Sequence, residues 1–335
     1  MMRVLVTGAS GFLGSHVVRA LRDRGHDVVA LCRNDVPAFL AEEGATVRRG
    51  DILDEDSVRD AAAGCDAVLH CAGKVSRDPN DAEILHRVHV VGTRNVLNAC
   101  KAAKVTRAVI ASTSGVVAVS EDGDAIANEE TATPIGIVGK FPYYRSKLFA
   151  EQAALAMNEL TFAVISVNPA LLLGPGDTHG SSTEDVRLFL ERKVPAVPDG
   201  GLSYVDARDA AEGMCLALER GQGGRRYLLG ACNLTVREFF ARLERVSGVK
   251  SPWLPLPGDV SRLTGGLLGR ISRAIGAPSV DAPSLAMARL FWYLDSSRAE
   301  RELGWMPRDP IATLADTVAD LRARGVVWPA SDTAS

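Results

Sequence analysis

The chain has 335 residues, of which 47% are hydrophobic and 24% are charged. This length and composition suit one large α/β domain with a sizeable core and a smaller second domain. The formal net charge of -3 at pH 7 gives no electrostatic reason to expect nucleic acid or an anionic membrane as a partner. The longest apolar stretch, residues 162–173, is interrupted by Asn168-Pro169 and is far shorter than the ~20 residues of a membrane-spanning helix.

Two further features predict a cytoplasmic protein. The first apolar run starts at Val4, which leaves no room for a secretory signal peptide. The six cysteines form no C-x-x-C pair and have no metal-ligand spacing. We therefore expect reduced, buried thiols and no metal site.

In chain order, apolar strands alternate with helical segments. The strand Val4-Leu5-Val6 passes through a glycine-rich loop into a helix that ends near Arg24. Further strands are predicted over residues 27–31, 46–49, 67–70, 108–111 and 162–167, and helices over 57–63, 82–103 and a segment that contains Tyr143. This alternation is typical of an α/β protein with a doubly wound parallel sheet.

The loop after the first strand has the spacing G-x-x-G-x-x-G. Gly8 permits a sharp turn, Gly11 leaves no side chain where phosphates must approach, and Gly14 lets the helix pack close to the strand. The helix start at Phe12 and Leu13 offers free N–H groups to an anion. The loop predicts a dinucleotide pyrophosphate site, and a tight strand–helix turn without a ligand is the alternative.

A second motif follows in Tyr143-Tyr144-Arg145-Ser146-Lys147. The Y-x-x-x-K spacing places Tyr143 and Lys147 on one face of a helix, one turn apart. Hydroxyl side chains also follow a predicted strand, in Ser112-Thr113-Ser114. Any one of these motifs can occur by chance, but these two in one chain together with the glycine loop cannot readily do so.

With these motifs the chain resembles the short-chain dehydrogenase/reductase superfamily, in its extended branch, the NAD-dependent epimerase/dehydratase family, and within it the dihydroflavonol-reductase-like enzymes. The resemblance continues almost end to end, through Gly50-Asp51-Ile52-Leu53-Asp54, His70-Cys71-Ala72-Gly73, residues 92–96, Asn168-Pro169, residues 174–176 and residues 204–209. It implies an NAD(P)-dependent oxidoreductase with a Rossmann domain and a smaller C-terminal substrate-binding lobe.

The chain is expected to divide into these two parts non-contiguously. Residues 1–173 and about 202–230 are predicted to form the dinucleotide-binding domain. Residues of about 174–201 and 231–325 are predicted to form the substrate-binding lobe, and 326–335 a frayed tail. The segment from Leu263 to Ile275 is predicted to form a lid over the pocket, with a membrane contact as the weaker alternative.

Cofactor preference depends on the end of the second strand, where NAD enzymes place an acidic residue. Here the first charged residue is Arg33, which favours NADP because a guanidinium can pair with the 2′-phosphate. Asp35 nearby keeps NAD as the alternative. The resemblance implies that Asp51 and the Ile52 backbone bind the adenine, and that Ala72, Lys147 and Pro169 also contact the cofactor.

The expected chemistry is hydride transfer with Tyr143 as the acid or base. The Lys147 ammonium one turn away should favour the phenolate, and by resemblance it also binds the nicotinamide ribose. The family's oxyanion donor falls on Thr113, with Ser114 as the alternative. His89 stands where the family often has Asn; we expect His86 and His89 to form a polar helix face or a dimer contact rather than a metal site.

Several substrate classes share this machinery. Dehydratases of the family carry acidic residues after the catalytic Thr, whereas this chain has Ser114-Gly115, so dehydration is disfavoured. The predicted small lobe is rich in apolar residues, which favours reduction of a small apolar or aromatic ketone or aldehyde. The alternative is that these residues only pack in the hydrophobic core of the lobe. They include Leu263, Leu267, Leu268, Ile271 and Phe291-Trp292. The alternatives are a nucleotide-sugar epimerase with a tightly bound NAD, and a non-catalytic NADP-binding regulatory protein.

Related enzymes commonly pair through two long helices, so we also expect a homodimer. The helices would be those of residues 82–103 and 142–158. The predicted seam contains Val96, Leu148 and Ala153.

Overall fold

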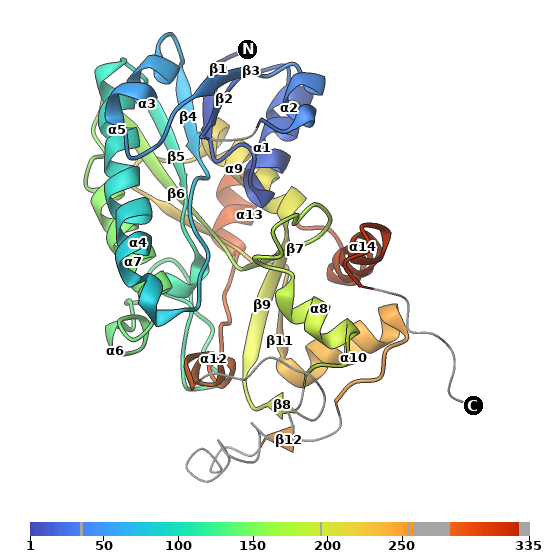
Figure 1. Ribbon diagram of the computed structural model, residues 1–335. Coiled ribbons are helices and arrows are strands. Elements are labelled where there is room, and N and C mark those ends of the chain that lie inside the picture. Colours follow the sequence, from blue (N-terminus) through green and yellow to red (C-terminus); the bar gives the residue numbers. More distant parts are fainter. Residues whose placement is uncertain (34–35, 195, 253–254, 257–281, 328–335) are drawn as a thin grey trace.

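The computed structural model describes residues 1–33, 36–194, 196–252, 255–256 and 282–327. Asp35 and the predicted lid of residues 263–275 lie outside them. The main sheet has seven parallel strands in the order β10-β6-β5-β4-β1-β2-β3 (Figure 1). The strands are β1 (Arg3–Thr7), β2 (Asp27–Cys32), β3 (Thr46–Arg49), β4 (Ala67–His70), β5 (Arg107–Ala111), β6 (Ala163–Pro169) and β10 (Arg226–Leu229). The predicted doubly wound sheet is confirmed.

Helices cover both faces of this sheet, and each face has its own hydrophobic core. On one face α1 (Phe12–Asp23) packs against α9 (Ala207–Arg220), which also contacts β5 and β6. On the other face lie α3 (Glu55–Ala62), α5 (Gly92–Ala102) and α7 (Pro142–Leu155). Because the strands are covered on both sides, their apolar residues form continuous runs rather than alternating ones.

The long helix predicted over residues 82–103 is helical throughout, but it is not uniform. It consists of α4 (Ala82–His86), a π-helical turn η2 (Arg87–Val91) and α5. Wider turns of this kind often occur at functional sites, because they displace one side chain from the regular helical face. The residue at the centre of this turn is His89.

A smaller lobe lies beyond the carboxyl ends of the main strands (Figure 1). Its sheet has the order β11-β9-β7, with β7 (Leu171–Leu173), β9 (Gly201–Asp206) and β11 (Cys232–Thr235). Its core is closed by α8 (Glu184–Leu190), α10 (Val236–Ser247) and α14 (Pro310–Ala323). The shorter elements are α2 (Ala38–Glu42), η1 (Pro79–Asp81), η3 (Ser114–Val116), α6 (Ile135–Val138), β8 (Val197–Pro198), β12 (Pro255–Leu256), α12 (Ala282–Ala288) and α13 (Ser297–Leu303).

The small sheet draws β7 and β9 from within the ranges predicted for the dinucleotide-binding domain, whereas α9 and β10 pack with the main sheet. The domain boundaries therefore stay a prediction. Two of the three predicted seam residues are wrong, because Val96 and Leu148 are buried inside the chain. Ala153 is half-buried, and the homodimer stays a prediction. Within the described ranges, no helix has both the length and the apolar character needed to cross a membrane.

Candidate active site

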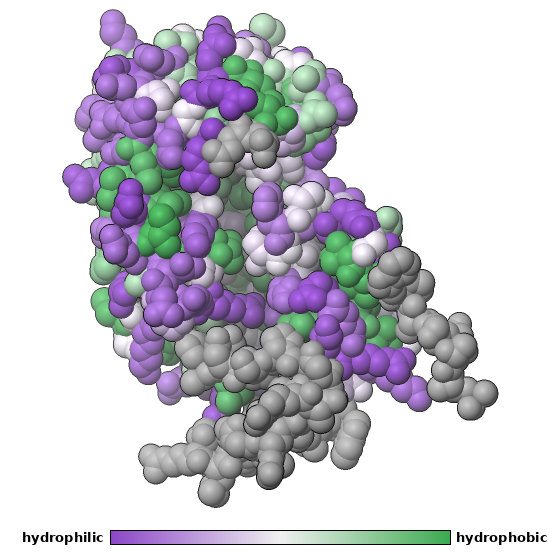
Figure 2. All heavy atoms as spheres, viewed as in Figure 1, coloured by the Kyte–Doolittle hydropathy of each residue, from purple (hydrophilic) through white to green (hydrophobic). Residues whose placement is uncertain are grey.

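A cavity of about 1300 Å³ lies between the carboxyl edge of the main sheet and the small lobe. It is larger than the ~300–1,000 Å³ of a typical small-molecule pocket, so a dinucleotide and a substrate can occupy it together. Figure 2 shows the viewed face hollowed at this place. Every residue that the sequence predicts for the site lines the cavity: Gly8, Gly11, Phe12, Leu13, Gly14, Arg33, Asp51, Ile52, Ala72, Thr113, Tyr143, Lys147 and Pro169. The structure thus brings them together, while their individual roles stay predictions.

The glycine loop is shaped by close backbone contacts. Gly8 has φ +71°, and a Cβ atom there would lie 2.5 Å from the backbone nitrogen of Ala72. A Cβ atom on Gly14 would lie 2.0 Å from the Gly8 carbonyl oxygen, so only glycine fits at either position. Gly11 caps α1, whose first turn holds no acidic residue. The helix start therefore presents unopposed positive potential to the cavity, which fits a pyrophosphate group.

Residues that follow β2 and β3 form another part of the cavity wall. Asp51 accepts a hydrogen bond from the Leu53 N–H (3.0 Å), and Asn95 donates to the Ile52 carbonyl oxygen (3.1 Å). These contacts fix the turn at the edge of the cavity. Arg33 is exposed directly after β2, at the rim of the same space.

A network of buried polar side chains lies beneath the cavity. Thr7 Oγ1 lies 2.6 Å from His70 Nδ1, and His70 Nε2 lies 3.0 Å from Thr93 Oγ1. Thr7 Oγ1 also accepts from the Ala72 N–H (3.4 Å). Burial lowers the pKa of His70 to about 3, with a further contribution from the Lys147 charge, so the imidazole is neutral.

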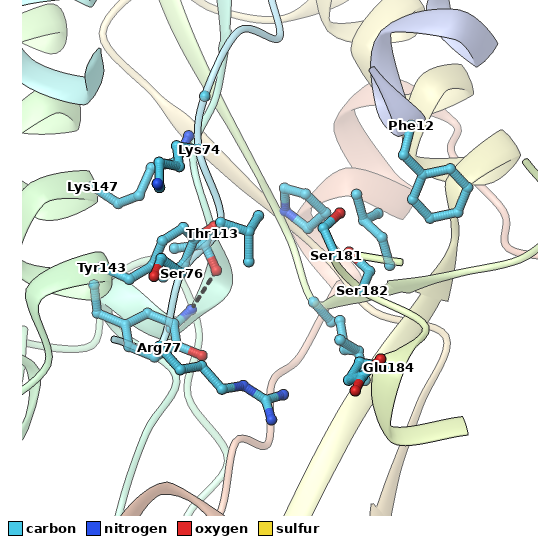
Figure 3. Close-up of a pocket in the computed structure, with 18 of the residues that line it drawn as sticks. Phe12, Lys74, Ser76, Arg77, Thr113, Tyr143, Lys147, Ser181, Ser182 and Glu184 are labelled. Carbon is cyan, nitrogen blue, oxygen red and sulfur yellow. Dashed lines mark hydrogen bonds between the residues drawn. The ribbon is translucent and has the colours of Figure 1, made fainter. Parts of the chain in front are cut away.

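Tyr143 and Lys147 project from α7 toward the cavity (Figure 3). Lys147 Nζ donates to the Ala111 carbonyl oxygen at 2.8 Å. Burial lowers the pKa of Lys147 to about 8, and the nearby Glu151 carboxylate opposes that shift. The lysine is therefore mostly charged at pH 7, as its predicted role requires.

The protonation of Tyr143 differs from the sequence expectation. We expected Lys147 to favour the phenolate, but burial raises the pKa of Tyr143 well above its usual value, with a smaller contribution from Tyr144. Loss of solvation disfavours the charged phenolate. The resting side chain is the neutral phenol, which is the form that can donate a proton.

All three hydroxyl residues after β5 line the cavity: Ser112, Thr113 and Ser114. Ser112 and Ser114 are buried, whereas Thr113 is half-buried and lies beside Tyr143 (Figure 3). Thr113 Oγ1 accepts from the Gly115 N–H at 3.3 Å, which leaves its hydroxyl hydrogen available to donate. Its backbone carbonyl is held by Asn168 Nδ2 at 3.1 Å.

His89 is a residue of the site, and the expectation of a polar helix face or dimer contact is wrong for it. Its Nε2 accepts from the Lys74 N–H (3.1 Å), so Nδ1 carries the hydrogen and donates to Ser146 Oγ (2.8 Å). Ser146 in turn donates to the Tyr143 carbonyl oxygen (2.8 Å). Burial, with the Lys147 charge, lowers the pKa of His89 to about 2. His86 is exposed and does not share this arrangement.

Beyond Tyr143 the cavity wall is aromatic and apolar. Tyr144 stacks on Trp292 with ring centroids 4.7 Å apart, and a Cβ atom on Gly115 would lie 2.3 Å from the Tyr144 ring. Other apolar side chains here are Leu171, Leu188, Leu202, Phe239 and Leu290. At the rim, Arg77 forms a two-fold hydrogen-bonded pair with Asp185 (3.1 and 2.8 Å) that joins the two sides of the cavity. Ser181, Ser182 and Glu184 face Lys147 and Tyr143 across the gap (Figure 3).

Residues 4–230 match the model of the NAD dependent epimerase/dehydratase family. The chain belongs to this family. It is 34% identical to a putative dihydroflavonol 4-reductase of Synechocystis sp., over 96% of this chain and 95% of that protein. It is 31% identical, over 92% of both chains, to the 4-hydroxy-2-methyl-3-oxo-4-farnesyl-3,4-dihydroquinoline-1-oxide ketoreductase of Stigmatella aurantiaca. The crystal structure of gox2253 is 32% identical, with a TM-score of 0.84 and coverage of 98% of this chain and 100% of that one.

Family membership and the reductases among its relatives make this protein an NAD(P)-dependent oxidoreductase of the extended short-chain type. In this enzyme, sequence reasoning missed three contributors to the site, namely His70, His89 and Glu151. The sequence signal that could have identified His89 is its position three residues before Gly92-Thr93, the start of a segment that matches the family. His70 lay inside a segment already matched to the family, and Glu151 had only its spacing of four from Lys147.

Proposed function

We propose that this enzyme reduces the ketone or aldehyde group of a small apolar or aromatic substrate with NADPH, and oxidises the alcohol in the reverse direction. The observation that carries the substrate class is the stacked Tyr144–Trp292 pair beside Tyr143. Two aromatic faces and an aliphatic wall favour a substrate that is itself apolar or planar. Two relatives are named for a dihydroflavonol and for a farnesyl-bearing dihydroquinoline, which agrees with this class.

The residues present fit a nicotinamide dinucleotide, because the positions of Gly8 and Gly14 admit no side chain and the α1 terminus favours phosphate. When bound, the cofactor supplies the hydride. Tyr143 donates the proton to the carbonyl oxygen, and Thr113 donates a hydrogen bond to the same oxygen. Lys147 stabilises the negative charge that develops on the Tyr143 oxygen as its proton leaves. Arg33 at the rim favours NADP over NAD because it can pair with a 2′-phosphate.

A screen of NADPH consumption tests this proposal. Purified protein is mixed with NADPH and aromatic and aliphatic aldehydes and ketones, and absorbance is followed at the reduced-nicotinamide band. UDP-glucose is incubated with the protein separately and its epimer is detected by chromatography, because epimerisation consumes no net NADPH. We expect turnover with an apolar carbonyl compound. Conversion of the nucleotide sugar alone would favour the epimerase alternative, and tight NADPH binding without turnover of any compound would favour a regulatory protein.

Variants then assign the roles. Tyr143→Phe should lose about 10²-fold or more of turnover while it retains NADPH binding. Lys147→Ala should impair both, and Thr113→Ala should lower turnover less. The matched control is Tyr227→Phe, which removes a hydroxyl that donates to Glu302 (2.9 Å) outside the cavity. If Tyr143→Phe keeps turnover within about threefold of the parent, Tyr143 is not the proton donor.

A further inference from the structure

A buried carboxylate lies behind Tyr143 and Lys147 on α7. Glu151 follows Lys147 by four residues, as Lys147 follows Tyr143, so the three side chains share one face of the helix. The Glu151 side chain is 0% exposed. A buried carboxylate is costly unless it is paired, and the reaction described above does not use this one.

The partners of Glu151 come from two neighbouring strands of the main sheet. Arg226 of β10 lies 2.8 Å from Glu151 Oε1 as an ion pair. Asn168 of β6 donates to Oε2 at 2.6 Å, and Ser166 Oγ of β6 lies 3.2 Å from the same oxygen. Arg226 and Ser166 are direct neighbours in the β10–β6 register. The carboxylate is therefore fixed to the sheet and closed off from solvent.

Two connections lead from this carboxylate into the site. Asn168 Nδ2 donates both to Glu151 and to the Thr113 carbonyl oxygen (3.1 Å), and Asn168 Oδ1 accepts from Ser166 (2.8 Å). The orientation of the Asn168 amide is thereby determined, and with it the start of the η3 turn that carries the Thr113 hydroxyl. The second connection is electrostatic, because the negative charge one turn from Lys147 favours the ammonium form in a poorly solvated environment.

We propose that Glu151 is a positioning residue of the reductase site, which supports the positive charge of Lys147 and, through Asn168, fixes Thr113. It touches neither substrate nor cofactor and acts through these neighbours. The chemical consequence rests on the proposed function, but the charge and the contacts can be measured without turnover.

The first measurement is the pH dependence of Lys147 acylation by acetic anhydride, read by mass spectrometry. Lys147 lines the cavity and only the neutral amine reacts, so the midpoint reports its protonation. Glu151→Gln keeps the side-chain volume and removes the charge. We expect its midpoint to fall by about one pH unit relative to the parent. The control Glu302→Gln removes a carboxylate that pairs with Arg225 (2.8 Å) away from the cavity, and its midpoint should equal that of the parent.

The second measurement separates the two connections with the best carbonyl compound of the screen. Glu151→Gln should move the alkaline limb of kcat/KM to lower pH by the same amount as the acylation midpoint. Asn168→Ala keeps the charge and releases Thr113, so kcat should fall about 10- to 100-fold with no shift of the limb. A structural role alone would lower kcat without moving the Glu151→Gln profile.

A folded Glu151→Gln protein, verified by circular dichroism, whose acylation midpoint matches the parent would overturn the proposal. If that variant does not fold, Glu151→Asp decides: it keeps the charge but shortens the reach to Asn168, so the midpoint should stay and kcat should drop as in Asn168→Ala. An Asp variant with the parent kcat would equally contradict it. If the parent itself reduces no carbonyl compound, the proposed function fails, while the acylation midpoints still decide the role of Glu151.

Discussion

Lowering the pH from 7 to 5 is expected to destabilise the folded protein through two buried histidines. Burial lowers the pKa of His70 to about 3 and that of His89 to about 2, from an ordinary value of 6.5. Both imidazoles are thus neutral in the folded protein at pH 5, whereas in the unfolded chain they are protonated. The unfolded state binds more protons in this window, so stability is fully present above about pH 6.5 and is lost as the pH falls below it.

The size of this loss of stability is set by how strongly the histidines are protonated in the unfolded chain. At pH 5 an unfolded histidine is protonated roughly 30 times more often than it is neutral, which costs the folded state about 2 kcal/mol for each buried neutral imidazole. Together His70 and His89 remove about 4 kcal/mol, against a total stability of about 5–15 kcal/mol for a typical domain. At pH 7 the same calculation gives only a few tenths of a kcal/mol.

Urea unfolding at pH 7, 6 and 5 and constant ionic strength measures the effect in the parent, in His89→Asn and in His86→Asn. Asn can accept from the Lys74 N–H and donate to Ser146, as His89 does, but it does not titrate. The parent should lose about 2 kcal/mol more than His89→Asn between pH 7 and pH 5, while exposed His86 should follow the parent. Carboxylates titrate alike in all three proteins and cancel in the comparison. Parallel curves for the parent and His89→Asn would refute this reasoning.

Two further predictions concern the cofactor and the assembly. Calorimetry should show tighter binding of NADPH than of NADH. Arg33→Asp should weaken NADPH binding by about 10- to 100-fold, the contribution of a charged hydrogen bond, and so erase or reverse the preference. Equal affinities of the parent for the two cofactors would rule out this role of Arg33. Light scattering at micromolar concentration should report a homodimer, now expected to use the exposed apolar side chains Val91 (39%) and Phe149 (46%) of η2 and α7. Phe149→Glu should then give monomers, and a monomeric parent would argue against this assembly.

The main sheet could be predicted from sequence because its strands carry a local signal. β3 and β4 have the predicted bounds, Thr46–Arg49 and Ala67–His70, since each is a short run between turn or helix residues. The site could be predicted for the same reason. Its motifs directly follow β1 and β5, end β6 or open a helix, and the carboxyl ends of parallel strands meet at one edge.

The remaining features depend on contacts that no local pattern encodes. His89 and Ser146 are 57 residues apart in sequence, and the π-helical turn that brings them together leaves no recognisable pattern. Val96 and Leu148 lie on the expected helices, but an apolar helical position does not reveal whether its partner is the chain's own sheet or a second copy. Here both residues pack within the chain, because each belongs to one of its hydrophobic cores.

Burial, rather than added charge, determines the electrostatics around Lys147. It holds His70, His89 and Tyr143 neutral, and it raises the pKa of the Cys71 thiol to about 12. These neutral groups surround the Lys147 ammonium in a medium that screens poorly, so in the proposed reaction its field would act strongly on the Tyr143 oxygen as the proton leaves. The same burial lowers the pKa of Lys147 to about 8, so the charge that assists the reaction is close to being lost. A carboxylate placed one turn away and sealed from water opposes that loss without entering the cavity, so a fully buried Glu151 is compatible with the apolar cavity wall.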